Sequence, residues 1–124
     1  DFDALVINCP PRSGQCPRWD QGQMDTLIQE IGEKHRVLVT NPTTATNVTQ
    51  IDRTVCQIGN LALRAKFVVA VASGAHWGIH SVWSQDVPTY LFLDDPLKLD
   101  YGRDIPHHGL VCGMRDELRK DGWL

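Results

Sequence analysis

The sequence predicts an α/β fold: a doubly wound parallel sheet of four or five strands in a three-layer αβα arrangement. Two observations predict it. Short apolar runs, typical of strands buried on both faces, occur at residues 4–7, 37–40, 67–72 and 89–93. Stretches with the spacing of an amphipathic helix separate these runs. Because parallel strands need crossover connections, this alternation favours helices on both faces of one sheet.

The helices are predicted from apolar spacing and end signals. Asp20 and Gln23 have the spacing of a capping box before the first helix, and Gly32 is a plausible stop. The apolar residues of this helix recur at i, i+3, i+4 and i+7: Met24, Leu27, Ile28 and Ile31. Similar spacing predicts a second helix over 51–65 and a short third one over 75–85.

Two segments give weaker signals. The polar, threonine-rich stretch 41–49 is either loop or a short edge strand around 45–48. Residues 96–113 have no regular pattern, and a short helix over 115–120 is expected to end at Gly122.

Composition limits the function classes. The chain of 124 residues has the size of a single domain, so one α/β domain over 1–124 is expected. Its net charge of −3 argues against a nucleic-acid binder, and no apolar run has the length of a membrane span. A cytoplasmic location is favoured.

The cysteines and histidines do not predict a metal centre. No two cysteines have zinc-knuckle spacing. A Cys9–Cys16 disulfide is sterically feasible, but free thiols are favoured from the alternating architecture. His76 and His80 lie one helical turn apart without the glutamate of a metalloprotease motif, so a polar stripe facing a cleft or a partner is favoured over a metal site. No metal and no cofactor are predicted.

Ligands of open α/β sheets bind beyond the carboxyl ends of the strands. Four polar segments follow predicted strands here: residues 8–17, 41–49, 73–76 and 94–95. These segments are therefore the candidate binding loops.

The segment Ser73-Gly74-Ala75-His76 is the most informative of the four. Glycine permits a sharp turn and a close backbone approach, and the free N–H groups of a helix start attract an anion such as a phosphate. The alternative is that Ser73 only caps the helix and Gly74 only makes the turn.

Two further segments carry charge at strand ends. Arg12, in the sequence Arg12-Ser13-Gly14, has the chemistry to pair with a diphosphate, or is a solvated surface arginine. Asp94 and Asp95 have the chemistry to accept hydrogen bonds from sugar hydroxyls, or only turn the chain before Pro96. The first loop has neither a Walker motif nor a G-x-G-x-x-G fingerprint, which argues against a P-loop nucleotidase and a nicotinamide dehydrogenase.

In their order, these pieces resemble the C-terminal, nucleotide-sugar-binding domain of GT-B-fold glycosyltransferases. The nearest likeness is to the heptosyltransferase-like group, glycosyltransferase family 9 and its relatives. The likeness covers about residues 4–95 and rests on short motifs: LVIN at 5–8, RSG at 12–14, RWD at 18–20, FVVAVASGAH at 67–76 and VPT at 87–89. The family often has an acidic residue just before the Ser-Gly pair, where this chain has Ala72.

The resemblance implies a Rossmann-like half of a larger glycosyltransferase that binds a nucleotide-sugar donor. The diphosphate is then expected at residues 73–76, with Arg12 or Ser13 neutralising it and Asp94 reaching a sugar hydroxyl. The family's catalytic base lies in an N-terminal domain, which this chain lacks. The isolated chain is therefore expected to bind donor without catalysing transfer, with that domain or another protein as its partner.

Two other functions stay open. A nucleoside deoxyribosyltransferase-like enzyme has a comparable strand and turn, but it needs a nucleophilic glutamate in the next helix, and residues 75–85 contain no carboxylate. A non-catalytic interaction module with a merely polar sheet end is the other alternative.

Overall fold

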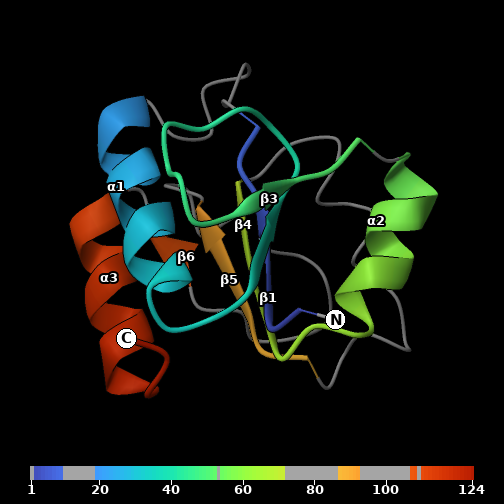
Figure 1. Cartoon of the computed structure of the whole chain (residues 1–124). Coiled ribbons are helices and arrows are strands. Elements are labelled where there is room, and N and C mark those ends of the chain that lie inside the picture. The colour runs from blue at the N-terminus through green and yellow to red at the C-terminus, as the bar shows by residue number, and fades with distance from the viewer. Residues whose placement is uncertain (1, 10–18, 53, 72–86, 93–106, 109) are drawn as a thin grey trace.

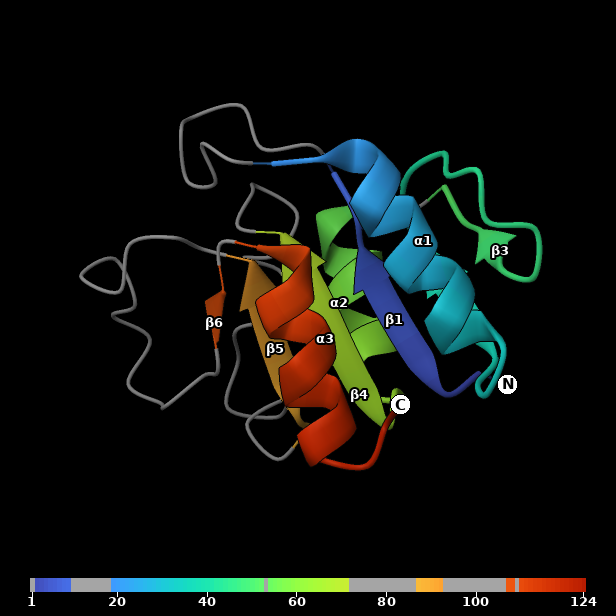
Figure 2. The same cartoon turned by 90° about the vertical axis from the view of Figure 1, so that its left-hand side faces the viewer.

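The structure is a computed structural model that describes residues 2–9, 19–52, 54–71, 87–92, 107–108 and 110–124. Within these ranges the chain forms one sheet with helices on both of its faces (Figures 1 and 2). The helix expected over 75–85 lies outside the described residues.

The sheet is entirely parallel, which confirms the predicted fold class. Its spatial order is β3-β2-β1-β4-β5-β6. Four strands coincide with the predicted apolar runs: β1 (Ala4–Ile7), β2 (Val37–Val39), β4 (Phe67–Val71) and β5 (Thr89–Phe92). The edges are two-residue strands, β3 (Thr49–Gln50) and β6 (His107–His108). The strand β6 lies in a stretch for which the sequence predicts no regular structure.

The order of the strands creates a reversal point between β1 and β4. From β1 the chain moves outward to β2 and β3, and α2 (Val55–Ala62) then returns it to β4 on the other side of β1. The helices α1 (Gln21–Gly32) and α3 (Val111–Lys120) cover one face, and α2 lies on the opposite face (Figure 1). The three layers are therefore those of a doubly wound sheet.

The first helix begins and ends as its sequence predicts, but its last residue has another role. Asp20 is the N-cap, and its Oδ1 accepts a hydrogen bond from the Gln23 backbone N–H at 3.1 Å. Gly32 is the last helical residue and its φ is not positive. A Cβ there would lie 2.5 Å from Asn47 Oδ1, so a larger residue would displace the Asn47 side chain, which donates to the Gln29 carbonyl of α1.

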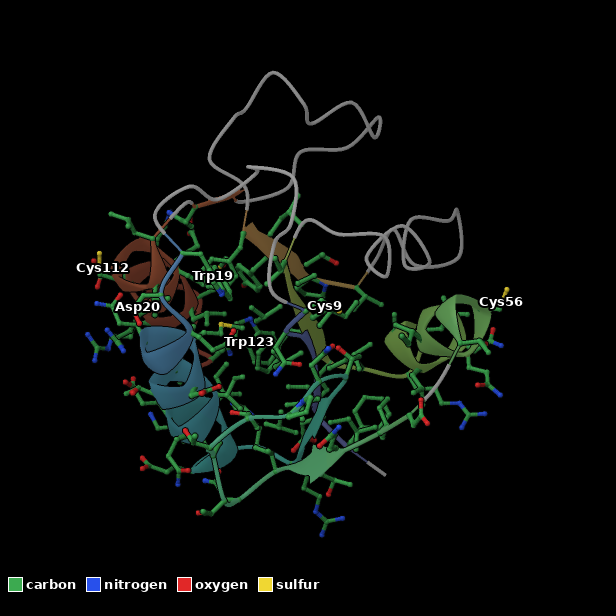
Figure 3. The ribbon with its side chains drawn as sticks, turned by 90° about the horizontal axis from the view of Figure 1, so that it is seen from above. Cys9, Trp19, Asp20, Cys56, Cys112 and Trp123 are labelled. Atoms are coloured by element: carbon green, nitrogen blue, oxygen red, sulfur yellow. The ribbon has the colours of Figure 1, made fainter. Side chains whose placement is uncertain are left out.

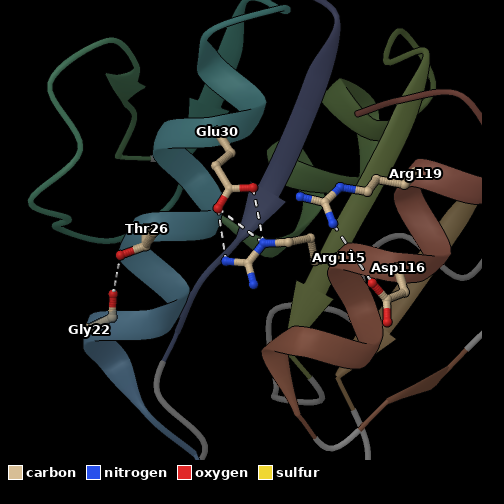
Figure 4. Close-up of polar contacts among 6 residues, drawn as sticks. All are labelled: Gly22, Thr26, Glu30, Arg115, Asp116 and Arg119. Atoms are coloured by element: carbon tan, nitrogen blue, oxygen red, sulfur yellow. Dashed lines mark hydrogen bonds and ion pairs between the residues drawn. The ribbon is translucent and has the colours of Figure 1, made fainter.

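The other two helices differ from their expected limits. A capping box between Thr54 and Gln57 starts α2 at Val55, four residues after the expected position. The helix α3 begins at Val111 rather than near residue 115, and it ends before Gly122, whose φ of 89° only glycine adopts readily. Arg115 of α3 binds both carboxylate oxygens of Glu30 on α1 at 3.0 Å, which joins the two helices (Figure 4).

The core has two parts because alternate strand residues point to opposite faces. On the α1 and α3 face, strand residues such as Val6, Val69 and Phe92 pack with Met24 and Leu118. On the α2 face, a second set packs with the helix: Leu5, Ile7, Val68, Ala70 and Leu91 against Ile58 and Ala62.

None of the described helices has the length and apolar character that a membrane crossing requires.

Candidate functional site

All nine sequence-predicted site residues lie outside the described residues: Arg12, Ser13, Gly14, Ser73, Gly74, Ala75, His76, Asp94 and Asp95. The strands that precede them are described. The strands β1 and β4 are neighbours in the sheet, with Ile7 paired to Ala70. The predicted segments 12–14 and 73–76 therefore follow adjacent carboxyl ends, at the reversal point of the strand order.

A group of four polar side chains follows β1 and β2 at this edge of the sheet, and we call it the strand-end cluster: Asn8, Cys9, Thr40 and Asn41. Asn8 is its most buried member, at 1% exposure. Its Oδ1 accepts from the Asn41 backbone N–H at 2.8 Å, and its Nδ2 donates to the Asn41 carbonyl at 3.1 Å. The Asn8 side chain thus replaces a backbone partner and extends the β1–β2 hydrogen-bond ladder beyond the strands.

The side chain of Asn41 is oriented by two neighbours. Its Oδ1 accepts from the Thr40 hydroxyl at 3.0 Å and from the Cys9 thiol at 2.9 Å. A thiol donates to an oxygen, whereas an amide N–H2 facing sulfur would meet only a weak acceptor. This chemistry places the oxygen of the amide on the side of Cys9. The Thr40 hydroxyl is also closer to Asn41 Oδ1, at 3.0 Å, than to Asn8 Oδ1, at 3.4 Å. Within the described parts of the chain, nothing accepts a hydrogen bond from Asn41 Nδ2.

The start of α1 lies at the same edge of the sheet and carries a negative charge. The carboxylate of Asp20 accepts from the first turn of the helix, so it occupies the position that an anion would otherwise take. The preceding Trp19 packs edge-on against Phe92 at the carboxyl end of β5, with ring centroids 5.3 Å apart. Seen from above in Figure 3, Trp19 and Asp20 lie on the α1 side of the sheet.

The cysteines that the structure describes are free thiols. They are Cys9, Cys56 and Cys112, and Figure 3 shows the last two on opposite sides of the molecule. The less favoured alternative, a Cys9–Cys16 disulfide, involves Cys16, which lies outside the described ranges. In the described ranges, no group of three or more His, Cys, Asp or Glu side chains has the geometry of a metal site. His76 and His80 of the predicted polar stripe lie outside these ranges.

A second side-chain cluster lies at the opposite, amino-terminal edge of the sheet. The Tyr90 hydroxyl donates to Asp121 Oδ2 at 2.6 Å and accepts from Trp123 Nε1 at 2.9 Å. The Trp123 ring stacks on Phe67 at 4.3 Å, and His35 Nε2 contacts the Trp123 carbonyl at 2.8 Å. Burial and the Asp121 carboxylate raise the pKa of Tyr90 well above its usual value, so its hydroxyl stays protonated and serves as a structural donor.

Sequence reasoning identified the segments of the first cluster but not its members' roles. The signal was present, because Asn8 and Asn41 each follow a buried strand directly or after one residue. The second cluster was missed. It joins side chains as far apart in sequence as His35 and Trp123, and no local pattern records such a contact.

Fold and geometry together define a small doubly wound α/β domain with a neutral polar cluster beside the reversal point of its sheet. Comparison with known proteins adds no family: no family model, no curated protein and no solved structure matches the chain.

Proposed function

We propose that the chain is a nucleotide-sugar-binding domain of a glycosyltransferase, with the diphosphate held at the carboxyl ends of β1 and β4. The observation that carries the proposal is the adjacency of these two strands at the reversal point of the sheet. Ligands of doubly wound sheets bind in the crevice outside this point. Both segments with phosphate-binding chemistry, 12–14 and 73–76, follow these two strands.

The negative charge at the start of α1 favours the turn after β4, rather than the start of α1, as the phosphate site. In many doubly wound domains the phosphate binds at the start of the first helix. Here Asp20 caps that helix, and its carboxylate would repel a diphosphate. The turn after β4 has no acidic residue between Ala72 and Ser84, and it offers the Ser-Gly pair.

In this proposal, backbone N–H groups of Ser73 to His76 bind the diphosphate, and Arg12 or Ser13 neutralises it. Asp94 or Asp95, after β5, accepts a hydrogen bond from a sugar hydroxyl. Sugar transfer also needs a base beside the acceptor hydroxyl. That base comes from another domain or another protein, so the chain alone binds donor without turnover.

The test is thermal unfolding with a nucleoside diphosphate. A ligand that binds only the folded state at 100-fold its Kd adds about 2.7 kcal/mol, which raises the Tm by several degrees. Gly74→Val removes the rise, because a branched side chain blocks the close backbone approach. Gly22→Val is the matched control in the exposed first turn of α1 and keeps the rise. A rise that survives Gly74→Val places the site elsewhere, and no rise in the unaltered chain contradicts the proposal.

A further inference from the structure

The amide of Asn41 differs from the other amide of the strand-end cluster in having a spare donor. Asn8 uses both ends of its buried side chain to bind the backbone of Asn41. Asn41 has its Oδ1 held by Thr40 and Cys9, while its Nδ2 has no acceptor within the described residues. The side chain is half-buried, so a ligand can reach it.

The position of Asn41 matches one arm of an extended ligand. Neighbouring strands of a sheet lie about 4.8 Å apart, so the carboxyl end of β2 is about 10 Å from that of β4, with β1 between them. A nucleoside joined to a diphosphate at β4 is long enough to cross β1 and reach this point. On the side of β4 away from β1, Trp19 packs against Phe92 at the carboxyl end of β5.

We propose that Asn41 Nδ2 is a specificity-determining donor that binds an acceptor oxygen of the nucleoside. This inference rests on the proposed function and adds the place and polarity of the nucleoside subsite. The acceptor is a carbonyl oxygen of the base, because a ribose hydroxyl both donates and accepts and would bind an amide or a carboxylate. A carboxylate at this position would accept hydrogen bonds from two hydroxyl groups, whereas the amide N–H groups donate to an oxygen.

Asn41→Asp tests the proposal because the substitution changes one end of the side chain. The remaining Oδ1 still accepts from Thr40 and Cys9, while a carboxylate oxygen replaces the donor. Asn60→Asp is the matched control, since it makes the same change of charge at an exposed position of α2. The probes are UDP, ADP and inorganic pyrophosphate, with Kd measured by calorimetry.

We expect Asn41→Asp to weaken UDP binding about tenfold more than pyrophosphate binding, since a donor facing an oxygen becomes an acceptor facing one. The loss is expected for UDP and not for ADP, since uracil has carbonyl oxygens and adenine has none. An equal loss for ADP overturns the inference. Asn60→Asp leaves all three affinities unchanged. Equal losses for UDP and pyrophosphate show charge repulsion alone and overturn the inference while the proposed function stands. An unaltered chain that binds neither probe contradicts both.

A measurement on the unaltered chain guards against misfolding of the variant. The side-chain N–H2 pair of Asn41 gives its own NMR signals. UDP is expected to shift them strongly and pyrophosphate only weakly. Equal shifts with both probes, or no shift with UDP, overturn the inference.

Discussion

At its amino end β1 is tied to β2 by Asp3, and at its carboxyl end by Asn8. Both side chains accept a hydrogen bond from the backbone of the β2 side of the sheet, Asp3 from Arg36 at 3.0 Å and Asn8 from Asn41 at 2.8 Å. The two side chains differ in charge and in burial. Asp3 is partly exposed and pairs with Lys66 at 3.2 Å, whereas Asn8 is neutral and 1% exposed.

The two ends of β1 therefore differ in whether a charged side chain is tolerated there. A carboxylate is tolerated at the amino end because water and Lys66 stabilise it. At the carboxyl end the same bond is made by an amide, so the side chain that ties β1 to β2 there carries no charge. A neutral side chain at this position suits a diphosphate, since a buried carboxylate there would cost energy to desolvate and would repel the ligand.

The largest expected effect concerns the amino end, where Phe67 is fully buried and stacks on Trp123. Phe67→Ala is predicted to lower the free energy of unfolding by about 3–5 kcal/mol, because it leaves a cavity beneath the Trp123 ring. Urea unfolding measures this loss. Leu63→Ala, at a residue 38% exposed, is the control and changes stability by less than about 1 kcal/mol. Equal effects of the two substitutions would contradict the account of this cluster.

The second prediction places at the carboxyl end of β1 the same kind of carboxylate that Asp3 provides at the amino end. Asn8→Asp buries a carboxylate and turns the donor that faces the Asn41 carbonyl into an acceptor. The loss at pH 7 is predicted to be about 3 kcal/mol.

Its pH dependence has a definite sign. Burial raises the pKa of the new carboxyl above the unfolded value of about 3.9, so the defect is small below about pH 4 and grows as the pH rises. Urea unfolding at several pH values checks this. A variant as stable as the unaltered chain at pH 7 would show that charge at this end of β1 is of no consequence.

The smallest effect is expected for Asp3→Asn, which makes the opposite exchange. The amide oxygen still accepts from Arg36, and only the exposed pair with Lys66 is lost, so the change is below about 1 kcal/mol at pH 7. The backbone hydrogen bond from Arg36, and then Lys66, lower the pKa of Asp3 below 3.8. Its contribution is therefore present above that pH and is lost as the pH falls. Acid unfolding curves of the variant are expected to be less steep in this range, and identical curves would refute the assignment.

The fold could be predicted from the sequence because its signals are local. The continuous apolar run of β4 and the helical spacing of the apolar residues of α1 are each visible within a few residues. The start of α2 was misplaced because Ile51 happens to continue the helical spacing, although Thr54 and Gln57 carry the capping box that decides it. The strand β6 was missed because two histidines have no strand pattern, and only its pairing with β5 makes them a strand.

The candidate site could be predicted only as a set of segments. The rule for parallel sheets names the edge where they meet, and the polar residues after each strand are visible in sequence. The division of labour within the cluster depends on geometry between residues more than 30 positions apart. Asn8 and Asn41 are both asparagines after buried strands, yet Asn8 forms hydrogen bonds from both ends of its amide and Asn41, among the described residues, only through its oxygen.

The most direct test of the central claim is an NMR titration of the unaltered chain with UDP, following the backbone amide of each residue. The account predicts the largest shifts at the carboxyl edge, for the amides of Asn8, Cys9, Thr40 and Asn41 and of the segments that follow β1 and β4. The amides of Asp3, Arg36 and Lys66 at the amino edge are predicted to stay in place. Saturable shifts centred on the amino edge, or an unchanged spectrum, would contradict it.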